Sequence, residues 1–482
     1  MKKLREILSN VSVNNIIGDP EISICNITKD SRMVNYGDVF VSIIGNNLDG
    51  TSFISDAIKN GAKCIISEKE FEIVDKEITY VFVESSRNSL AVISANYYEN
   101  PSRKLNLIGV TGTNGKTTIV DLLYNLYDSC GIKTGIISTI KIDVGNTTYN
   151  STQTTPDSTL INKYLYEMVQ NDVRYCFMEV SSHGIDQRRT HGLKFKGGVF
   201  TNLTHDHLDY HKNFKNYRDT KKVFFDNLSS DGFAISNCDD KNGLYMIQNT
   251  DAEIYTYSLK SNSNFKAKLL ESTFEGMMIK INNSELWCNL VGEFNVYNLL
   301  AVYATARTLG MPEENLLKGI SKLKSVKGRL QFLSNNEKIA IVDYAHTPDA
   351  LENVISSIKD IKSEKNSLIT VVGCGGDRDK SKRAIMGNIA SSLSTKVFFT
   401  SDNPRSENPS QIIDDIMDGV SSENIKKVTR ITDRREAIEM ALSIAKKNDI
   451  VLVAGKGHES FQEINGIKNN FNDFEVIKNI IG

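Results

Sequence analysis

Residues 105–126 read LNLIGVTGTNGKTTIVDLLYNL, and this stretch decides the fold class. Its first six residues form an apolar run typical of a buried strand, and the glycine-rich segment TGTNGKTT (111–118) follows directly. Apolar residues then recur at helical spacing, at Ile119, Leu122, Leu123 and Leu126. Strand, glycine-rich loop and helix in this order predict a phosphate-binding loop in a layered α/β domain.

This loop has residues suited to a nucleoside triphosphate. Glycines let backbone N–H groups face an anion, Lys116 can reach the terminal phosphates, and the Thr117 hydroxyl can bind Mg²⁺. The spacing departs from the common G-x-x-x-x-G-K pattern, because Val110 stands where a glycine is required. A tight turn that only packs a helix on a sheet is the alternative, but such a turn needs no lysine. The residues of this loop expected to bind phosphate are Gly112, Gly115, Lys116 and Thr117.

A second group of polar residues follows two further apolar runs. The segments are MEVSSHG (178–184), with Glu179, Ser181 and His183, and NLTHDHLDYH (202–211), with Asp206, His207, Asp209 and His211. A buried carboxylate such as that of Glu179 is costly without a partner, so a metal site is plausible. A nearby phosphate loop favours Mg²⁺ over zinc. The open alternative is that these histidines only form caps and hydrogen bonds.

The remaining apolar runs indicate three domains. YCFMEV (175–180) and GVFTNL (198–203) are expected as parallel strands beside the loop, and segments between 252 and 291, such as GMMIKI and ELWCNLV, as antiparallel hairpins. KIAIVDY, SLITVVG, KVFFTSD and DIVLVAG predict a second α/β domain after residue 330. Pro101 marks a linker, which gives domains of residues 1–103, 104–330 and 331–482.

Charged residues gather where the strands of the last domain end. The segments are DYAHTPDAL (343–351), GCGGDRDKSKR (373–383), SDNPRSENP (401–409) and AGKGHE (454–459). The basic residues expected to converge there are Arg378, Lys382, Arg383, Arg405 and Lys456. Such an edge suits a substrate with carboxylates, because arginine pairs with them through two hydrogen bonds. A solvated charged rim is the alternative.

Composition narrows the function classes. The 482 residues are 40% hydrophobic and carry a formal charge of −2, so attraction to nucleic acid or an acidic membrane is not indicated. The seven cysteines form no C-x-x-C pair, which favours reduced thiols in the cytoplasm. The N-terminus lacks the apolar core of a signal peptide, and no apolar run of about 18 residues predicts a membrane span.

Several of these motifs together resemble the Mur ligases of peptidoglycan synthesis, over all three predicted domains. They are GVTGTNGKTT, TTP (154–156), MEVSSHG, TNLTHDHLDYH, GEFNVYN (292–298), KGR, DYAHTPDAL and GKGHE. The resemblance implies a UDP-binding N-terminal domain, a central P-loop-type ATPase domain with a parallel sheet, and a Rossmann-like C-terminal domain for an amino acid. It also implies that ATP converts a peptide carboxylate into an acyl phosphate, which an amine then attacks.

Two motifs indicate the substrates. GCGGDRDK and DNPR resemble the motifs of the family members that add meso-diaminopimelate to UDP-N-acetylmuramoyl-L-alanyl-D-glutamate. Arg405 can pair with the distal carboxylate of diaminopimelate, a group that lysine lacks. Ligation of L-lysine or another amino acid is the alternative. A folylpolyglutamate or cyanophycin synthetase relative shares the loop, but the segment DSR…GDVFVSIIG favours a UDP-binding domain. A nucleotide-binding scaffold without catalysis is the third alternative.

The resemblance implies a role for each matching residue. Contacts to the UDP-muramoyl-dipeptide are implied for Ser31, Asn46, Asn47, Thr154, Thr155, Ser181, Gln187 and Arg189. ATP contacts are implied for Gly112, Thr113, Asn114, Gly115, Lys116, Thr117, Thr118, Asn295, Arg329 and Asp343. Diaminopimelate contacts are implied for Arg378, Asp402, Asn403, Pro404, Arg405, Gly455 and Glu459. Catalytic roles are implied for Lys116, Glu179, His207 and Lys221. Magnesium coordination is implied for Thr117, Glu179, His207 and Lys221. Lys221 is implied to be carbamylated, with the adjacent Lys222 as the alternative position, and the chain is expected to act as a monomer.

Overall fold

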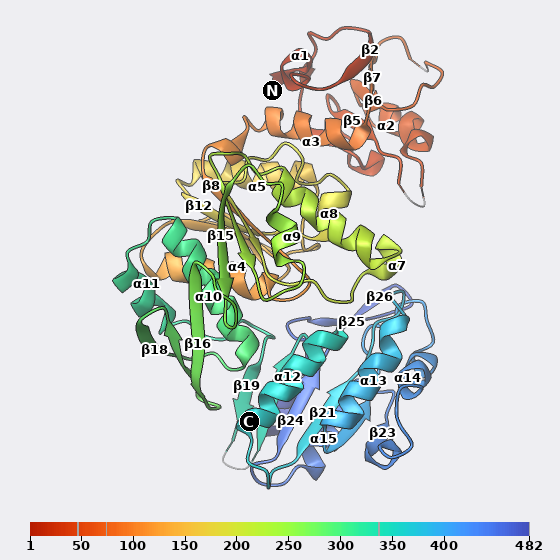
Figure 1. Cartoon of the computed structure of the whole chain (residues 1–482). Helices are drawn as coiled ribbons and strands as arrows, with labels where there is room; N and C mark the ends of the chain where they lie inside the picture. Colours follow the sequence, from red (N-terminus) through yellow and green to blue (C-terminus); the bar gives the residue numbers. More distant parts are fainter. Residues whose placement is uncertain (46–47, 74, 336–337, 482) are drawn as a thin grey trace.

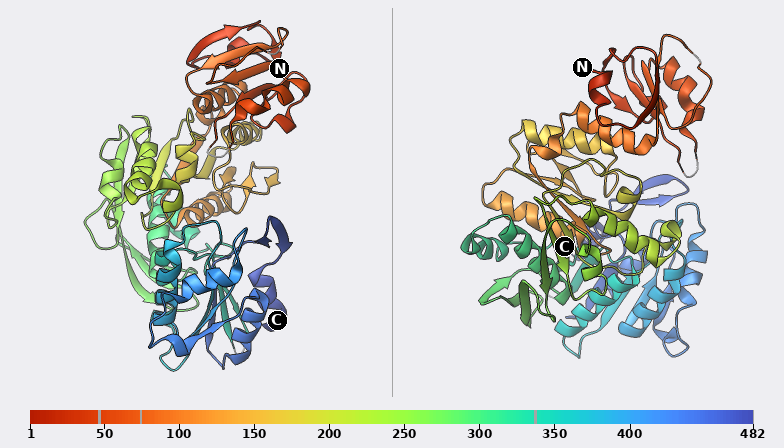
Figure 2. Two further views of the ribbon diagram at one scale, coloured as in Figure 1. Left: turned by 90° about the vertical axis from the view of Figure 1, so that its right-hand side faces the viewer. Right: turned by 45° about the horizontal axis from the view of Figure 1, so that its top comes forward.

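The computed structural model describes residues 1–45, 48–73, 75–335 and 338–481. Three sheet-centred units follow one another along the chain and are stacked from the N-terminal unit to the C-terminal one (Figure 1). Two further views show the same stacking (Figure 2). Within the described residues, no helix combines the length and hydropathy needed to cross a bilayer.

The N-terminal unit has a five-stranded sheet in the order β2-β7-β6-β5-β4, covered on both faces by apolar side chains. Its strands are β1 (Lys2–Lys3), β2 (Val13–Ile17), β3 (Ser23–Ile24), β4 (Ile27–Thr28), β5 (Val39–Ser42), β6 (Cys64–Ser67) and β7 (Thr79–Val83). Its helices are α1 (Leu4–Ile7), α2 (Ile54–Lys59) and α3 (Ser86–Tyr97), with 3₁₀ turns at Ser31–Met33, Gly50–Phe53 and Pro101–Arg103.

The middle unit is built on a sheet in the order β11-β10-β9-β12-β8-β13-β14-β15-β16-β17-β18. Its strands are β8 (Asn106–Thr111), β9 (Thr134–Ile137), β10 (Ile142–Asp143), β11 (Thr148–Tyr149), β12 (Tyr175–Glu179), β13 (Gly197–Phe200), β14 (Phe233–Asn237), β15 (Glu253–Ser258), β16 (Phe265–Ser272), β17 (Met277–Ile281) and β18 (Ser284–Cys288). Its helices are α4 (Lys116–Ser129), α5 (Ser158–Gln170), α6 (Ser182–Asp186), α7 (Leu208–His211), α8 (Phe214–Asp226), α9 (Gly243–Ile247), α10 (Glu293–Thr308) and α11 (Glu313–Ile320).

The centre of this sheet is parallel, as predicted. β8 pairs in parallel with both β12 and β13, and its apolar side chains enter cores on both faces. A strand buried on both faces reads as a continuous apolar run, which is why LNLIGV predicts it. β17 and β18 are antiparallel, which confirms the predicted hairpin, whereas β15 differs because it runs parallel to β14 and extends the central sheet.

The C-terminal unit has a sheet in the order β19-β20-β24-β21-β22-β23, parallel from β20 to β23. Its strands are β19 (Gln331–Ser334), β20 (Ile339–Asp343), β21 (Leu368–Val372), β22 (Lys396–Phe399), β23 (Val428–Arg430), β24 (Ile450–Ala454), β25 (Phe461–Ile464) and β26 (Ile467–Asn470). Its helices are α12 (Pro348–Ile361), α13 (Ser381–Leu393), α14 (Pro409–Met417), α15 (Arg434–Ile444) and α16 (Asp473–Ile481), with a 3₁₀ turn at Ile425–Lys427. The three-domain α/β class is thereby confirmed.

Polar contacts join the units. Between the first two, Ser94 Oγ on α3 lies 3.0 Å from Thr159 Oγ1 on α5. Between the last two, Asn114 Nδ2 donates to Asp349 Oδ2 over 2.9 Å. The proposed boundary at 103–104 falls between the 3₁₀ turn that ends at Arg103 and β8, and the one at 330–331 falls at the start of β19.

Candidate active site

Three neighbouring strand ends assemble the polar groups of the middle unit. β12, β8 and β13 are adjacent and parallel, so their carboxyl ends share one edge of the sheet. Glu179 is the last residue of β12 and pairs in register with Val110, and the phosphate-type loop starts just after β8. The segment with His207 follows β13. Ligands of open α/β sheets bind at such an edge, where the order of the strands reverses.

The loop between β8 and α4 has the conformation that its glycines permit. Gly115 caps α4 with a φ of 87°, in the left-handed region that favours glycine. A Cβ on Gly112 would lie 1.9 Å from Thr201 Oγ1, so only glycine fits there. Lys116 donates to the carbonyls of Gly112 and Thr113 over 2.9 and 2.7 Å. The lysine is therefore held at the start of α4, where phosphates bind in loops of this kind.

Glu179 is buried and hydrogen bonded. Its side chain accepts from Thr139 N over 2.7 Å and from Thr117 Oγ1 over 3.0 Å. Its negative charge partly offsets the effect of burial on Lys116, which still lowers the pKa of that ammonium. The carboxylate of Glu179 therefore contacts the phosphate-type loop directly, through Thr117.

His207 faces the same edge. Its Nε2 lies 3.3 Å from Asp206 Oδ2, and its ring packs edge-on against His183 at 4.9 Å between centroids. Burial lowers the pKa of His207 to about 3, although Asp206 opposes the shift. A neutral imidazole can bind a metal. His211, also predicted for this site, instead lies within hydrogen-bonding distance of Ser182 Oγ, 2.9 Å from its Nε2.

Lys221 lies on α8, behind the loop. Its Nζ donates to the Gly112 carbonyl over 2.8 Å, and the residue is only 1% exposed. Burial, followed by the charge of Lys116, lowers its pKa well below the usual value. The adjacent Lys222 forms an ion pair with Asp226, one helical turn away. The two lysines therefore differ, since Lys221 alone contacts the phosphate-type loop.

The donor set fits a hard divalent cation. A hydroxyl from Thr117, a carboxylate from Glu179 and a neutral imidazole from His207 are ligands compatible with Mg²⁺, which keeps several waters. In the part of the chain that the structure describes, no group of three or more His, Cys, Asp or Glu side chains is arranged to hold a metal. A carbamate on Lys221 would supply the further anionic oxygen that this group lacks.

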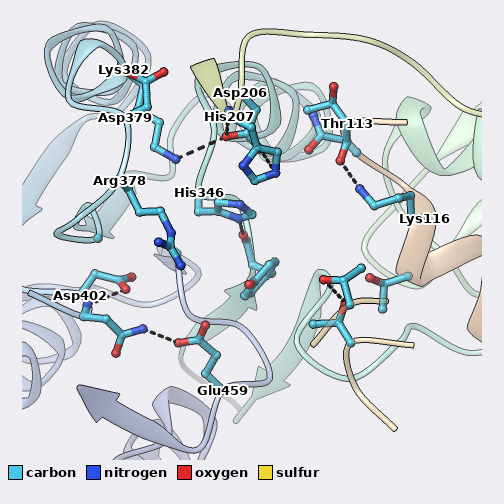
Figure 3. A pocket seen from close by; sticks show the side chains of 18 of the residues that line it. Thr113, Lys116, Asp206, His207, His346, Arg378, Asp379, Lys382, Asp402 and Glu459 are labelled. Carbon is cyan, nitrogen blue, oxygen red and sulfur yellow. Dashed lines mark hydrogen bonds and ion pairs between the residues drawn. The ribbon is translucent and has the colours of Figure 1, made fainter. Parts of the chain in front are cut away.

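Strand ends of the C-terminal unit face this edge across a shared cavity of about 270 Å³ (Figure 3). Asp402 and Arg405 follow β22, Gly455 follows β24, and Arg378 follows β21. The predicted residues that line it are Thr113, Asn114, Gly115, Lys116, Thr117, Thr154, Glu179, Asp206, His207, Asp209, Arg329, Arg378, Lys382, Asp402, Asn403, Arg405, Gly455 and Glu459. Groups expected to bind nucleotide, peptide and amino acid thus meet in one cavity, and Pro404 is absent from its lining among the described residues.

Two cations expected on this edge have another role. Arg383 is fully buried and its guanidinium pairs with Glu407 and Asp415, each at 2.8 Å. Lys456 is also fully buried and donates to Asn403 Oδ1 over 2.9 Å and to Glu459 Oε2 over 2.8 Å. The prediction that they face a substrate is therefore wrong. A buried charge requires a partner, and the partners of Arg383 and Lys456 are side chains of the protein itself.

A second cavity of about 500 Å³ lies on the other side of the loop. Asn114, Gly115 and Arg329 line both cavities, while Thr118 and Asp343 line only the second. The Asp343 carboxylate accepts from the backbone N–H groups of Leu330 and Ala345, both over 2.7 Å, so it also shapes the segment that carries Arg329. Asn295 lies behind this cavity and accepts from Asn298 Nδ2 over 2.9 Å.

The residues implied to bind the UDP-peptide divide into two places. Thr155 Oγ1 donates to the Glu179 carbonyl over 2.8 Å and accepts from Ser181 N over 3.0 Å. Thr155 and Ser181 therefore lie beside the sheet edge that carries Glu179. Arg189 donates to the Thr155 carbonyl and to Gln187 Oε1. Ser31 belongs to the N-terminal unit, in the 3₁₀ turn Ser31–Met33. Asn46 and Asn47 lie outside the described residues.

Sequence reasoning gave no role to three further residues of the cavity. Tyr344, His346 and Asp379 line it. The Tyr344 ring packs 4.6 Å from the His346 ring, and the Arg329 guanidinium lies 4.4 Å above Tyr344. DYAHTPDAL and GCGGDRDKSKR contain these residues, but periodicity does not separate a lining side chain from a packing one. Their position directly after a parallel strand is the signal that could have identified them.

Three family models match the chain. They are the Mur ligase family catalytic domain over residues 23–98, the Mur ligase middle domain over 110–306, and the Mur ligase glutamate ligase domain over 328–457. A UDP-N-acetylmuramoyl-L-alanyl-D-glutamate–2,6-diaminopimelate ligase of Phocaeicola vulgatus is 48% identical over 479 residues, 99% of each chain. A ligase of the same name from Clostridium tetani is 42% identical, again over 99% of each. A solved structure with that enzyme name has a TM-score of 0.69 at 31% identity and covers 100% of this chain and 98% of the other.

Proposed function

The chain belongs to the Mur ligase family, and on that premise we propose that it joins 2,6-diaminopimelate to UDP-N-acetylmuramoyl-L-alanyl-D-glutamate with ATP as the energy source. The observation that carries this proposal is the single cavity lined by Lys116, Glu179 and Arg405 from two domains. Relatives that match it from end to end bear the name of this ligase. A cavity that combines a phosphate loop with an arginine-rich edge suits the joining of two acidic substrates.

The chemistry has two steps. First, the free carboxylate of the D-glutamyl residue attacks the γ-phosphorus of ATP, ADP leaves, and an acyl phosphate forms. The lone pair of a diaminopimelate amine then forms the C–N bond, the C–O bond to phosphate breaks with its electron pair on the departing phosphate, and the amine loses a proton. Both steps bring several anions together, so cations placed beforehand lower the barrier.

Lys116 and the loop hold the phosphates in this proposal. Backbone N–H groups at the start of α4 face the β- and γ-phosphates, and the ammonium of Lys116 offsets their charge. The second cavity receives the nucleoside, with Arg329 and Asp343 along its wall. Its position on the far side of Asn114 and Gly115 supports this, because it leaves the γ-phosphate facing the first cavity.

Thr117, Glu179 and His207 hold Mg²⁺, which when bound offsets the phosphate charge. Lys221 joins them as a carbamate. Carbamylation needs a neutral amine, and burial, by lowering the pKa of Lys221 well below its usual value, favours that form. The contact of Lys221 with the Gly112 carbonyl supports a position for the modified side chain beside the phosphate site.

The remaining site residues bind the two acidic substrates. Thr154, Thr155, Ser181, Gln187 and Arg189 hold the peptide carboxylate near Glu179, and Ser31 contributes to the uridine site. Arg378, Asp402, Asn403, Arg405, Gly455 and Glu459 bind diaminopimelate. Asn403 donates to Glu459 over 2.8 Å, so these two side chains are mutually oriented. Arg405, which already lies 3.6 Å from Glu463 Oε2, pairs in addition with the distal carboxylate, and L-lysine would leave that second contact unmade.

One chain supplies both walls of the cavity, so a monomer suffices for this activity. Its seven cysteines are free thiols, which fits the cytoplasm.

An amino-acid competition assay tests the proposal. Purified protein with ATP, Mg²⁺ and the UDP-dipeptide is given meso-diaminopimelate and L-lysine, and product masses are compared. We expect diaminopimelate to be consumed faster. Faster use of L-lysine would overturn the substrate assignment, and no phosphate release with any amino acid would favour a scaffold without catalysis.

A further inference from the structure

Lys382 is a buried cation of the C-terminal domain that faces the middle domain. It lies in the first turn of α13, is 5% exposed and lines the shared cavity. Its side chain points across the cavity toward Asp206 and His207 (Figure 3), with Nζ 3.8 Å from Asp206 Oδ1. The cation thus reaches the edge proposed to bind metal and phosphate, although it belongs to the domain that binds the amino acid.

This ammonium has no hydrogen-bond acceptor among the described residues. The distance to Asp206 exceeds that of a hydrogen bond, and the positive end of the α13 dipole lies close by. A buried charge without hydrogen bonds is unfavourable unless a ligand completes its surroundings. A cation that lines a cavity under these conditions is suited to an anion held in that cavity.

The neighbouring cations of the same motif behave differently. Lys380 has a side chain that is 67% exposed, and it pairs with Glu407 at 3.2 Å. Arg383 is buried and its guanidinium donates to both Glu407 and Asp415. Of the three, only Lys382 is both buried and directed into the cavity. The position of Lys382 is therefore not explained by the basic residues at the start of α13 as a group.

The surrounding charges agree with an anionic ligand. Burial, and then the charge of Lys382, lower the pKa of His346 to about 4, so this imidazole is neutral near neutral pH. Burial opposes ionisation of Asp206, but His207 and Lys382 hold its pKa well below the usual range. Lys382 therefore interacts with both sides of the cavity, between Arg378 and the proposed metal ligands.

We propose that Lys382 is a catalytic residue that the C-terminal domain delivers to the acyl phosphate. Its ammonium donates to a phosphoryl oxygen while the amine forms the C–N bond and the C–O bond breaks, and it stabilises the charge that develops on the departing phosphate. Lys382 transfers no proton in this step, and the proton of the amine leaves separately. The inference rests on the proposed ligase function. It also explains why one segment carries both Arg378 and this cation, because the amino acid and the lysine then reach the acyl phosphate together.

The test compares Lys382→Met, which keeps the length of the side chain, with Lys380→Met as the matched control and Lys382→Arg as the conservative change. Phosphate release is measured at saturating diaminopimelate. We expect kcat to fall roughly 100-fold in Lys382→Met, the size of loss typical when one donor to a developing oxyanion is removed. Lys380→Met should match the unmodified chain, and Lys382→Arg should recover much of kcat. Thermal unfolding midpoints verify that each variant folds.

A second measurement separates the two chemical steps. Oxygen-18 scrambling within ATP, in the presence of the UDP-dipeptide and Mg²⁺ without amino acid, reports reversible formation of the acyl phosphate. We expect scrambling by Lys382→Met at a rate close to that of the unmodified chain. An equal loss of scrambling and turnover would overturn the assignment to the second step. A raised KM for diaminopimelate with unchanged kcat would overturn catalysis in favour of substrate binding or domain closure. If the unmodified chain itself shows neither scrambling nor phosphate release, the proposed function is refuted instead.

Discussion

Thr117 Oγ1 donates a hydrogen bond to Glu179 Oε2 over 3.0 Å, and this contact links the first turn of α4 to the end of β12. The other carboxylate oxygen of Glu179 accepts from Thr139 N. Both contacts fix the orientation of a carboxylate that is 1% exposed. Two proposed magnesium ligands are therefore held in place by the fold, and little reorganisation is needed when the cation binds.

Glu179→Gln should abolish most activity while the protein stays folded. The amide has nearly the same shape and can still accept from Thr139 N, but it removes the negative charge. We expect phosphate release to fall by at least about 100-fold and the Mg²⁺ concentration for half-maximal activity to rise. A magnesium titration of turnover measures both. Unchanged magnesium dependence would remove Glu179 from the proposed metal site.

Lys221→Met should stop turnover, whereas Lys222→Met should not. The reason is that Lys221 donates to the Gly112 carbonyl of the phosphate-type loop, while Lys222 pairs with Asp226 along α8. Carbon-13 NMR of protein incubated with labelled bicarbonate should show a carbamate signal in the unmodified chain and in Lys222→Met, and none in Lys221→Met. Full activity of Lys221→Met would exclude the carbamate from the mechanism.

Strand ends could be predicted from the sequence because parallel strands buried on both faces read as apolar runs. The runs that end in Glu179 and Asp343 are examples, and their polar last residues do line or support the cavities. The order of strands in space could not be predicted, because apolar runs carry no information about their neighbours. For the same reason the parallel pairing of β15 with β14 was not foreseen.

The role of each charged side chain was harder to predict than the location of the edge. Arg383 and Lys382 are adjacent in the sequence, yet one pairs with Glu407 inside the protein and the other faces the cavity. Helical geometry turns successive side chains by about 100°, so adjacent residues face different surroundings. Only the packing of α13 against its neighbours decides which of the two reaches the ligand.

Arg405→Leu should remove the preference for diaminopimelate. The guanidinium of Arg405 donates to the Gly376 carbonyl over 2.7 Å and is partly exposed to the cavity, so it can still receive a carboxylate. Loss of one partner of a charged pair costs about 2–5 kcal/mol, or roughly 30- to 5000-fold in kcat/KM for diaminopimelate. Arg430→Leu is the control, since Arg430 pairs with Asp414 away from the cavity. Equal losses in both variants would contradict a specific role.

Acidification should destabilise the protein through its buried histidines. Burial is the main cause that lowers the pKa of His346 to about 4 and that of His458 to about 3. The folded state therefore binds fewer protons than the unfolded state, so stability falls as the pH drops from about 6.5 toward 4, by at most about 1.4 kcal/mol per pH unit for each histidine. Scanning calorimetry at pH 7, 6 and 5 measures the decline. His346→Gln should make it shallower, and an identical slope would exclude His346 as a source.

Gly112→Ala should damage the phosphate-type loop. A Cβ there would lie 1.9 Å from Thr201 Oγ1 and 3.0 Å from the Asn202 carbonyl. The Gly112 carbonyl also accepts from both Lys116 and Lys221, over 2.9 and 2.8 Å, so a shift of this residue displaces two proposed catalytic lysines.

The matched control for Gly112→Ala is Gly131→Ala. Gly131 also has a positive φ, of 72°, but an added Cβ meets no atom within 4 Å. Both variants therefore carry backbone strain, and only Gly112→Ala adds a clash, which costs about 1–3 kcal/mol. We expect calorimetric titration with a non-hydrolysable ATP analogue to show weak binding for Gly112→Ala and normal binding for Gly131→Ala. Normal binding by both would show that the loop tolerates a side chain, and the proposed position of the phosphates would then be wrong.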